Sequence, residues 1–199
     1  MIQIKNAAEL QKMRKACAIS AAALKAGGEA IEPGITTAEI DKIIYDFIVR
    51  HGARPNFLHL YGFPATACIS VNDTVIHGIP NKQQQIRPGD IVSIDTGCKI
   101  DGFNGDNACT YACGKIDLEA QRLLDVTKES LHRGIEMACG GNRVGDIGHA
   151  VQSYVEENGF SVVRTFVGHG VGKELHEDPE VPNFVNAGRG PRLVPGMCI

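Results

Sequence analysis

Two aspartates stand where the sequence predicts a tight β-hairpin. Asp101-Gly102 separates two apolar, β-prone runs and suits a two-residue turn in which both residues have positive φ. That turn would pair Asp95 with Ala108 and place Asp106 on the same face as Asp95, diagonally across the strands. Two carboxylates so close repel each other unless a cation lies between them, so we interpret both as metal ligands. A solvated acidic face on an edge hairpin is the alternative interpretation.

Three of the seven histidines lie in glycine- or proline-rich loops after predicted strands, namely His77, His169 and His176. Binding and catalytic sites tend to be built on such loops. Two carboxylates and an imidazole suit divalent Mn, Fe, Co or Zn, and bridging carboxylates would allow two metal ions that hydrolyse a bond with an activated water. Histidines that are not ligands could polarise a scissile carbonyl or donate a proton to a leaving amine. A structural or surface role is expected for the other four histidines, His51, His59, His132 and His149.

Helices and short strands must position these residues. Capping residues and helical apolar spacing predict four helices, and they run from Asn6 to Gly27-Gly28, from Thr36 to Gly52, from about Asp117 to Gly140-Gly141, and from Val144 to Asn158. Residues 53–90 carry short extended runs and turns, and the β-rich residues 161–167 predict a further strand.

A weak internal repeat relates the two halves of the chain. At a constant offset of 107 residues, Gly34 aligns with Gly141 and Ile40 with Ile147. The order helix, helix, strands then occurs twice, which predicts an α+β fold of two pseudo-symmetric halves, about 1–111 and 112–199. We expect a single domain over residues 1–199 with a mainly antiparallel sheet. The mate of Asp95 would fall three residues beyond Ile199.

The composition limits the possible partners. The chain has 199 residues, a net charge of −3 and no long basic run, so a nucleic-acid or anionic-membrane surface is not expected. There is no apolar signal core and no apolar run of membrane-spanning length, which predicts a cytoplasmic protein. The seven cysteines include no Cys-x-x-Cys pair, which argues against a zinc knuckle, and their odd number argues against a disulfide framework.

Four segments, in this order, resemble the type I methionine aminopeptidases, which are metallopeptidases of the pitta-bread fold. The segments are YGFPATACISVNDTVIHGIP, IRPGDIVSIDTGCKIDGFNGD, VGHGVGKELHEDP and VPGMCI. The resemblance covers essentially the whole chain, and this chain lacks the long insertion that is typical of type II enzymes. It implies removal of the initiator methionine from nascent chains whose second residue is small, with two divalent metal ions (Co, Mn, Fe or Zn). The implied partners are the N-terminal segments of nascent polypeptides and the ribosome, and the implied state is a monomer.

The resemblance also implies roles for individual residues. Asp95, Asp106 and His169 match metal ligands, with Asp106 bridging. His77 and His176 match the histidines that contact the scissile peptide group and stabilise the tetrahedral intermediate. The pocket for the methionine side chain would be lined by Phe63 and Cys68, by Leu175 at a position that often carries an aromatic, and by Phe57 and Leu60 where many relatives have cysteine and tyrosine.

The family pattern has five metal ligands, and the last two are glutamates, the first shortly after Pro-Gly-Met. This chain stops at Ile199, before either, so we expect a C-terminally truncated domain without its last strands and with weak or no activity. Its unpaired sheet edge would favour self-association. Two alternatives remain: a binding or structural protein that keeps the fold without turnover, and a proline-specific or creatine-hydrolysing relative. The motif His77-Gly-Ile-Pro80 and the absence of a large N-terminal domain favour the methionine enzyme.

Overall fold

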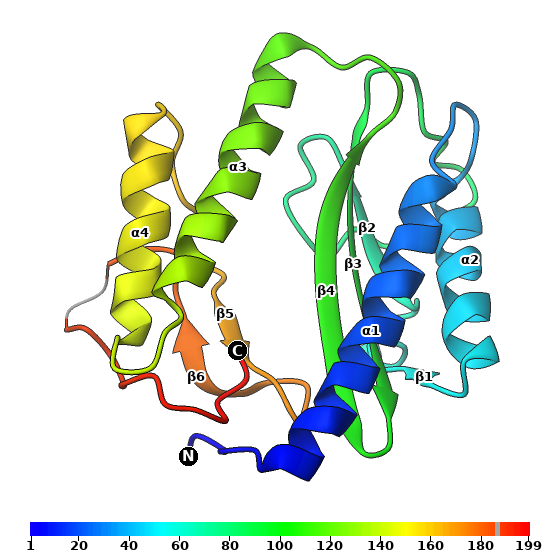
Figure 1. Cartoon of the computed structure of the whole chain (residues 1–199). Coiled ribbons are helices and arrows are strands. Elements are labelled where there is room, and N and C mark those ends of the chain that lie inside the picture. The colour runs from blue at the N-terminus through cyan, green and yellow to red at the C-terminus, as the bar shows by residue number, and fades with distance from the viewer. Residues whose placement is uncertain (186–187) are drawn as a thin grey trace. The chain divides into compact units, whose positions relative to one another are not determined.

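The computed structural model describes residues 1–185 and 188–199 (Figure 1). It divides into two compact units, which are described separately. The first unit comprises Glu9–Asp117 and Lys173–Leu175, and the second comprises Met1–Ala8, Leu118–Gly172 and His176–Ile199. These bounds differ from the predicted halves in three short segments. Residues 1–8 join the second unit, and residues 112–117 and 173–175 join the first, because these segments have their contacts there.

In the first unit, two helices pack on a β-sheet. They are α1 (Ala7–Glu29) and α2 (Thr37–Arg50). The start of α2 is the predicted capping box, since the Thr36 hydroxyl accepts from the Glu39 amide and the Glu39 carboxylate accepts from the Thr36 amide. The apolar stripe of α2 is buried in the core with strand residues and the end of α1; its fully buried members are Ile40, Ile44 and Ile48.

The predicted end of α1 at Gly27-Gly28 is wrong by a small margin, because the helix continues to Glu29. These glycines provide close packing instead of a stop. A Cβ on Gly27 would lie 2.7 Å from Ile44, and one on Gly28 would lie 2.2 Å from the ring of Tyr111. The missing side chains therefore let α1 approach α2 and the sheet closely.

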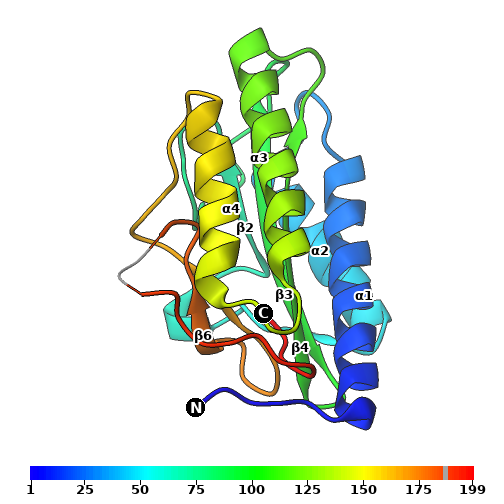
Figure 2. The same cartoon turned by 60° about the vertical axis from the view of Figure 1, so that its left-hand side comes forward.

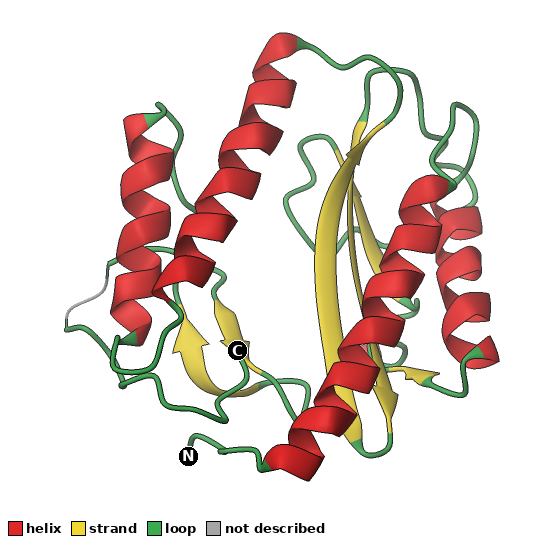
Figure 3. Ribbon diagram, in the orientation of Figure 1, coloured by secondary structure: helices red, strands yellow, loops and turns green. Residues whose placement is uncertain are grey.

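The sheet is antiparallel and is organised around β3 (Ile91–Ile100) (Figure 3). This strand pairs with β4 (Phe103–Ala112) along its whole length, and with β1 (Arg54–Pro55) and β2 (Ala67–Val71). A short 3-10 helix, Leu60–Gly62, stands between β1 and β2. The predicted α+β class with an antiparallel sheet is confirmed.

The second unit contains α3 (Leu118–Met137) and α4 (Val144–Glu157), which lie side by side in Figures 1 and 2. Val126 of α3 packs against Val151 and Val155 of α4. A Cβ on Gly134 would lie 3.0 Å from Val151, so the two helices approach closely at this glycine. The unit also holds an antiparallel hairpin of β5 (Gly168–Gly170) and β6 (Glu177–Val181).

The predicted strand over residues 161–167 is wrong, because these residues form a loop and β5 begins only at Gly168. The ladder of β5 and β6 starts with Gly168 opposite Val181. The next residue is Pro182, which has no amide hydrogen to donate to residue 167. A β-prone sequence forms a strand only where it finds a pairing partner.

The internal repeat is visible in the backbone of both units. Helices α2 and α4 have 14 residues each and start 107 residues apart. The same offset relates two isolated β-bridges, Thr36 with Gln85 and Arg143 with Arg192. The predicted pseudo-symmetry is therefore confirmed, since the turn before each helix pairs with the equivalent later segment. The expectation of a single domain stays a prediction.

None of the helices in the described part of the chain combines the length and apolar character that a membrane crossing requires.

Candidate active site

The two aspartates lie on the predicted hairpin in the predicted register. Asp101 and Gly102 have φ of 53° and 83°, as the two-residue turn requires. Asp95 faces Ala108 across β3 and β4, and Asp106 faces Gly97. Because Asp95 and Gly97 are two residues apart, both carboxylates project from the same face of the sheet.

The carboxyl groups of Asp95 and Asp106 interact directly. They share a hydrogen bond, and burial together with the charge of Asp106 raises the pKa of Asp95 to about 7. A pair held in this way binds a proton below about pH 7 unless a cation replaces it. The two side chains therefore fit a divalent metal ion, for which carboxylate oxygens are suitable ligands. In neither unit do the described residues gather three or more His, Cys, Asp or Glu side chains in a metal-binding group. Metal ligation thus stays a prediction for each residue.

Close packing behind the hairpin fixes the strand that carries Asp106. A Cβ on Gly105 would lie 2.5 Å from the backbone of Ala16 in α1, so the helix rests directly on β4. On the same strand pair, the Ser93 and Thr110 hydroxyls are 2.8 Å apart. The separation of the two carboxylates is consequently set by a ladder that has little freedom to move.

The five predicted pocket residues form one apolar cluster in the first unit. Phe57, Cys68 and Leu175 are buried, and Leu60 and Phe63 pack against them. Cys68 also faces Asp95 across β2 and β3. Burial, followed by the charges of Asp95 and Asp106, raises the pKa of the Cys68 thiol to about 12. The thiol therefore stays protonated and forms part of an apolar wall.

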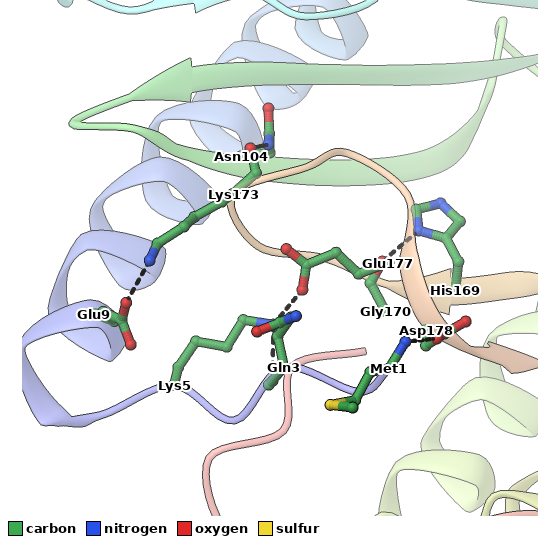
Figure 4. Close-up of polar contacts among 10 residues, drawn as sticks. All are labelled: Met1, Gln3, Lys5, Glu9, Asn104, His169, Gly170, Lys173, Glu177 and Asp178. Carbon is green, nitrogen blue, oxygen red and sulfur yellow. Dashed lines mark hydrogen bonds and ion pairs between the residues drawn. The ribbon is translucent and has the colours of Figure 1, made fainter.

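Leu175 is held in this cluster by contacts that the sequence analysis missed. The carbonyl of Lys173 accepts from the Lys99 ammonium at 2.5 Å and from the Asn104 amide at 3.0 Å. The Lys173 ammonium pairs with Glu9 at 2.9 Å (Figure 4). Asn104 is only 2% exposed, and a polar residue at a buried strand position could have signalled a structural hydrogen bond.

His77 follows β2 in a loop that is pinned to that strand. The amide of Gly78 donates to the Ser70 hydroxyl at 3.1 Å, and its carbonyl accepts from the Ile69 amide at 2.9 Å. A Cβ on Gly78 would lie 2.2 Å from the Ile69 carbonyl oxygen, so only glycine fits. His77 itself is exposed with a φ of 58°. Left-handed residues of this kind are enriched at functional sites.

His169 and His176 lie together on the hairpin of β5 and β6 in the second unit. Their ring centroids are 4.5 Å apart in an edge-to-face arrangement. Nδ1 of His169 lies 2.9 Å from the carbonyl oxygen of Gly170 (Figure 4), so Nδ1 carries the proton. Nε2 is then the nitrogen that can act as an acceptor or a ligand, which is the usual arrangement for a histidine that binds metal.

The structure thus brings the predicted residues into three groups. The aspartates form a pair on one hairpin, the imidazoles of His169 and His176 form a pair on another, and the pocket residues form a cluster. His77 lies on the loop after β2. The first unit contains the aspartates, the pocket cluster and His77, whereas the second contains the other two imidazoles.

Comparisons with known proteins identify the family of the chain. Residues 11–199 match metallopeptidase family M24. A methionine aminopeptidase of Clostridium perfringens is 53% identical over 199 residues, which is 100% of this chain and 80% of that protein. A crystal structure of a methionine aminopeptidase from Thermotoga maritima superposes with a TM-score of 0.96 at 41% identity, covering 99% of this chain and 79% of that one. The prolidase of Pyrococcus furiosus has a TM-score of 0.83 at 24% identity, covering 98% of this chain and 55% of that one, which shows the shared fold alone.

Proposed function

Because the chain belongs to metallopeptidase family M24, and within it to the methionine aminopeptidases, we propose that it releases methionine from peptides whose second residue is small. The natural substrates would be the N-terminal segments of newly made proteins that still carry their initiator methionine. The apolar cluster of Phe57, Cys68 and Leu175 supports this specificity, since an unbranched thioether side chain packs well among such groups.

The residues that would hold divalent metal ions are Asp95, Asp106 and His169. Bound ions of this kind polarise a peptide carbonyl and activate a water molecule for hydrolysis. The protein contributes two carboxylates that share a face of a rigid hairpin and an imidazole whose Nδ1 proton is held by the Gly170 carbonyl. The identity of the metal stays open among Co, Mn, Fe and Zn, which all accept these donors.

His77 and His176 would contact the scissile peptide group. An imidazole N–H donates a hydrogen bond to the oxygen on which negative charge develops, and the same group can pass a proton to the leaving amine. His176 suits this role because its ring packs edge to face against His169, which limits its rotation. His77 suits it because the loop that carries it is fastened to β2.

The observation that carries the proposal is the pair of neighbouring carboxylates at Asp95 and Asp106, together with the family match. The test is release of methionine from a Met-Ala-Ser peptide, with Mn or Co added and again with a chelator. We expect weak release that depends on metal, and still slower release from a Met-Leu-Ser peptide because its second residue is large. Failure to cleave Met-Ala-Ser with any of the four metals would contradict the proposal.

A matched pair of variants tests the role of His77. His59 and His77 are both exposed histidines of the first unit with positive φ, 70° and 58°. His77→Ala should lower kcat by about a hundredfold, as expected for loss of an oxyanion donor or proton donor. His59→Ala should leave kcat close to that of the unmodified chain. Equal loss in both variants would show that the effect comes from the backbone conformation.

A further inference from the structure

A buried ion pair joins the beginning of the chain to the hairpin that carries His169 and His176. The Lys5 ammonium lies 2.6 Å from the Glu177 carboxylate, and the two side chains are only 4% and 7% exposed (Figure 4). The residues are 172 positions apart in the sequence. A buried ion pair is often no more stabilising than a well-packed apolar pair, because both charges lose their hydration. A gain in stability alone therefore does not account for this contact. A role in fixing the orientation of the hairpin would account for it.

The segment around Lys5 is itself fixed. The Lys5 backbone amide donates to the Gly196 carbonyl at 2.8 Å, and the Lys5 ammonium also donates to the Gln3 carbonyl at 3.2 Å. At the exposed end of the same segment, the Met1 amino group pairs with Asp178, the residue after Glu177. The Met1–Asp178 pair is largely solvated and contributes little to stability. The contact that holds this segment is therefore the one between Lys5 and Glu177.

Glu177 is close in the hairpin to the residues that carry both imidazoles. It follows His176 directly and opens β6, and it pairs with Gly170, the residue after His169. Its carboxylate also covers Gly172, where a Cβ would lie 2.5 Å from Glu177 Oε1 and 2.6 Å from Lys5 Cε. The ion pair therefore fills the space beside the turn of this hairpin.

The hairpin has little regular pairing of its own. β5 has 3 residues, β6 has 5, and their register shifts between His169 and Gly170. Short ladders with an irregularity do not specify register strongly. An external contact that fixes one residue of the ladder would consequently fix the orientation of the rings.

We propose that Lys5 and Glu177 are positioning residues, and that the hydrogen bond between their side chains holds the β5–β6 hairpin so that the imidazoles of His169 and His176 keep their edge-to-face contact. The inference rests on the proposed function for its effect on the reaction, because those imidazoles are assigned there to metal binding and to the scissile peptide. Its effect on the ring contact can be measured without any activity.

The test compares two double variants that remove both charges. In Lys5→Gln/Glu177→Gln the two amides can still form a hydrogen bond, whereas in Lys5→Met/Glu177→Met they are replaced by apolar groups of similar volume. Both avoid leaving one buried charge alone, which is the main risk of a single substitution. Arg189→Met is the control, because it removes an ion pair with Asp146 at the start of α4 in the same unit.

The first readout is the nuclear Overhauser effect between the ring protons of His169 and His176 in the metal-free protein. We expect it to persist in the unmodified chain, in the control and in the glutamine pair, and to disappear in the methionine pair while thermal unfolding stays cooperative. The second readout is the release of methionine from the peptide substrate. In this assay, Lys5→Met/Glu177→Met should lower kcat by about tenfold or more and change KM little.

A methionine pair that keeps both the ring contact and kcat would overturn the proposal, and so would loss of the ring contact in both double variants. If the unmodified chain releases no methionine, the proposed function fails, but the ring contact still decides the positioning role. A methionine pair that does not fold leaves the glutamine pair to decide. If the contact between the rings of His169 and His176 persists in Lys5→Gln/Glu177→Gln, a hydrogen-bonded link between residues 5 and 177 is supported. If the ring contact is lost in that variant, such a link is contradicted.

Discussion

The two hairpins that carry the candidate functional residues are built in opposite ways. In the first unit, β3 and β4 have 10 residues each, join through a two-residue turn, and pair without interruption from Ile91–Ala112 to Ile100–Phe103. In the second unit, β5 and β6 are short, and their register shifts beside His169. The first hairpin can specify its own geometry, whereas the second takes its geometry from Lys5, a distant residue in the sequence.

This difference matches the demands that the residues would meet. Two carboxylates that repel each other need a stiff support, and a long ladder backed by α1 at Gly105 supplies it. The two imidazoles, one proposed to bind metal and one proposed to contact the substrate, need a defined orientation, and a few tertiary contacts are enough to provide one.

Asp106→Asn should lower both metal affinity and methionine release by more than about a hundredfold, because it removes a proposed ligand from the stiff hairpin. His176→Ala should lower release but leave metal affinity much less affected, since His176 is not a proposed ligand. Calorimetric titration with Mn measures the affinity. Asp101→Asn is the control, because it removes an acidic charge from the same hairpin while keeping a residue that tolerates positive φ. Equal loss of affinity in Asp106→Asn and His176→Ala would refute the division of roles.

Leu175→Ala tests the segment that connects β5 and β6 but belongs to the first unit. Leu175 is 8% exposed and packs on Phe57 and Cys68. Its truncation should raise KM for Met-Ala-Ser about tenfold and lower the free energy of unfolding by about 2–5 kcal/mol. Leu118→Ala, at a position that is 88% exposed, should change neither quantity. Steady-state kinetics and urea unfolding measure the two effects, and an unchanged KM would remove Leu175 from the pocket.

Gly170→Ala and Gly102→Ala compare the two hairpins directly. A Cβ on Gly170 would lie 2.3 Å from the Asp178 carbonyl oxygen, so the β5–β6 pairing must open, at a cost of about 1–3 kcal/mol. A Cβ on Gly102 meets nothing within 4 Å, and its cost comes from a φ of 83°, which for alanine is about 1 kcal/mol. The ring contact of His169 and His176 should be lost in the first variant only. Urea unfolding gives the stabilities, and a larger loss in Gly102→Ala would reverse the ranking.

The pH dependence of the metal-free protein should reveal the carboxylate pair. Asp95 has a pKa that is raised from 3.8 to about 7 in the folded state, so the folded chain binds a proton that the unfolded chain releases. The stability from this proton is complete below the unfolded pKa and is lost as the pH rises through about 7. The free energy of unfolding should therefore fall over that range, and it should fall less in Asp106→Asn. Asp41, whose pKa burial also raises, contributes equally to both proteins. Urea unfolding in the presence of chelator, at about pH 5 and about pH 8, measures the difference; parallel curves would contradict the coupling.

Much of the fold and part of the site follow from local sequence. Asp101-Gly102 determines a turn, the turn determines the register, and the register places Asp95 and Asp106 on one face. Thr36 and Glu39 determine the start of α2 in the same way, and the 107-residue offset reproduces that start at α4. These features depend on residues that are close in the chain or on a repeated pattern, so they can be recognised without coordinates.

The remaining features depend on contacts between distant residues. The strand expected at residues 161–167 is absent because these residues find no strand partner in the described part of the chain, and propensity does not reveal pairing partners. Leu175 joins the first unit because Asn104 and Lys99 hold the carbonyl of Lys173. Lys5 and Glu177 have no mutual signal across 172 positions. Local sequence therefore predicts which groups could do the chemistry and how the acidic pair is spaced, because neighbours in a hairpin fix each other's direction. The orientation of His169 and His176 could not be predicted in this way, because it depends on which distant charge meets Glu177.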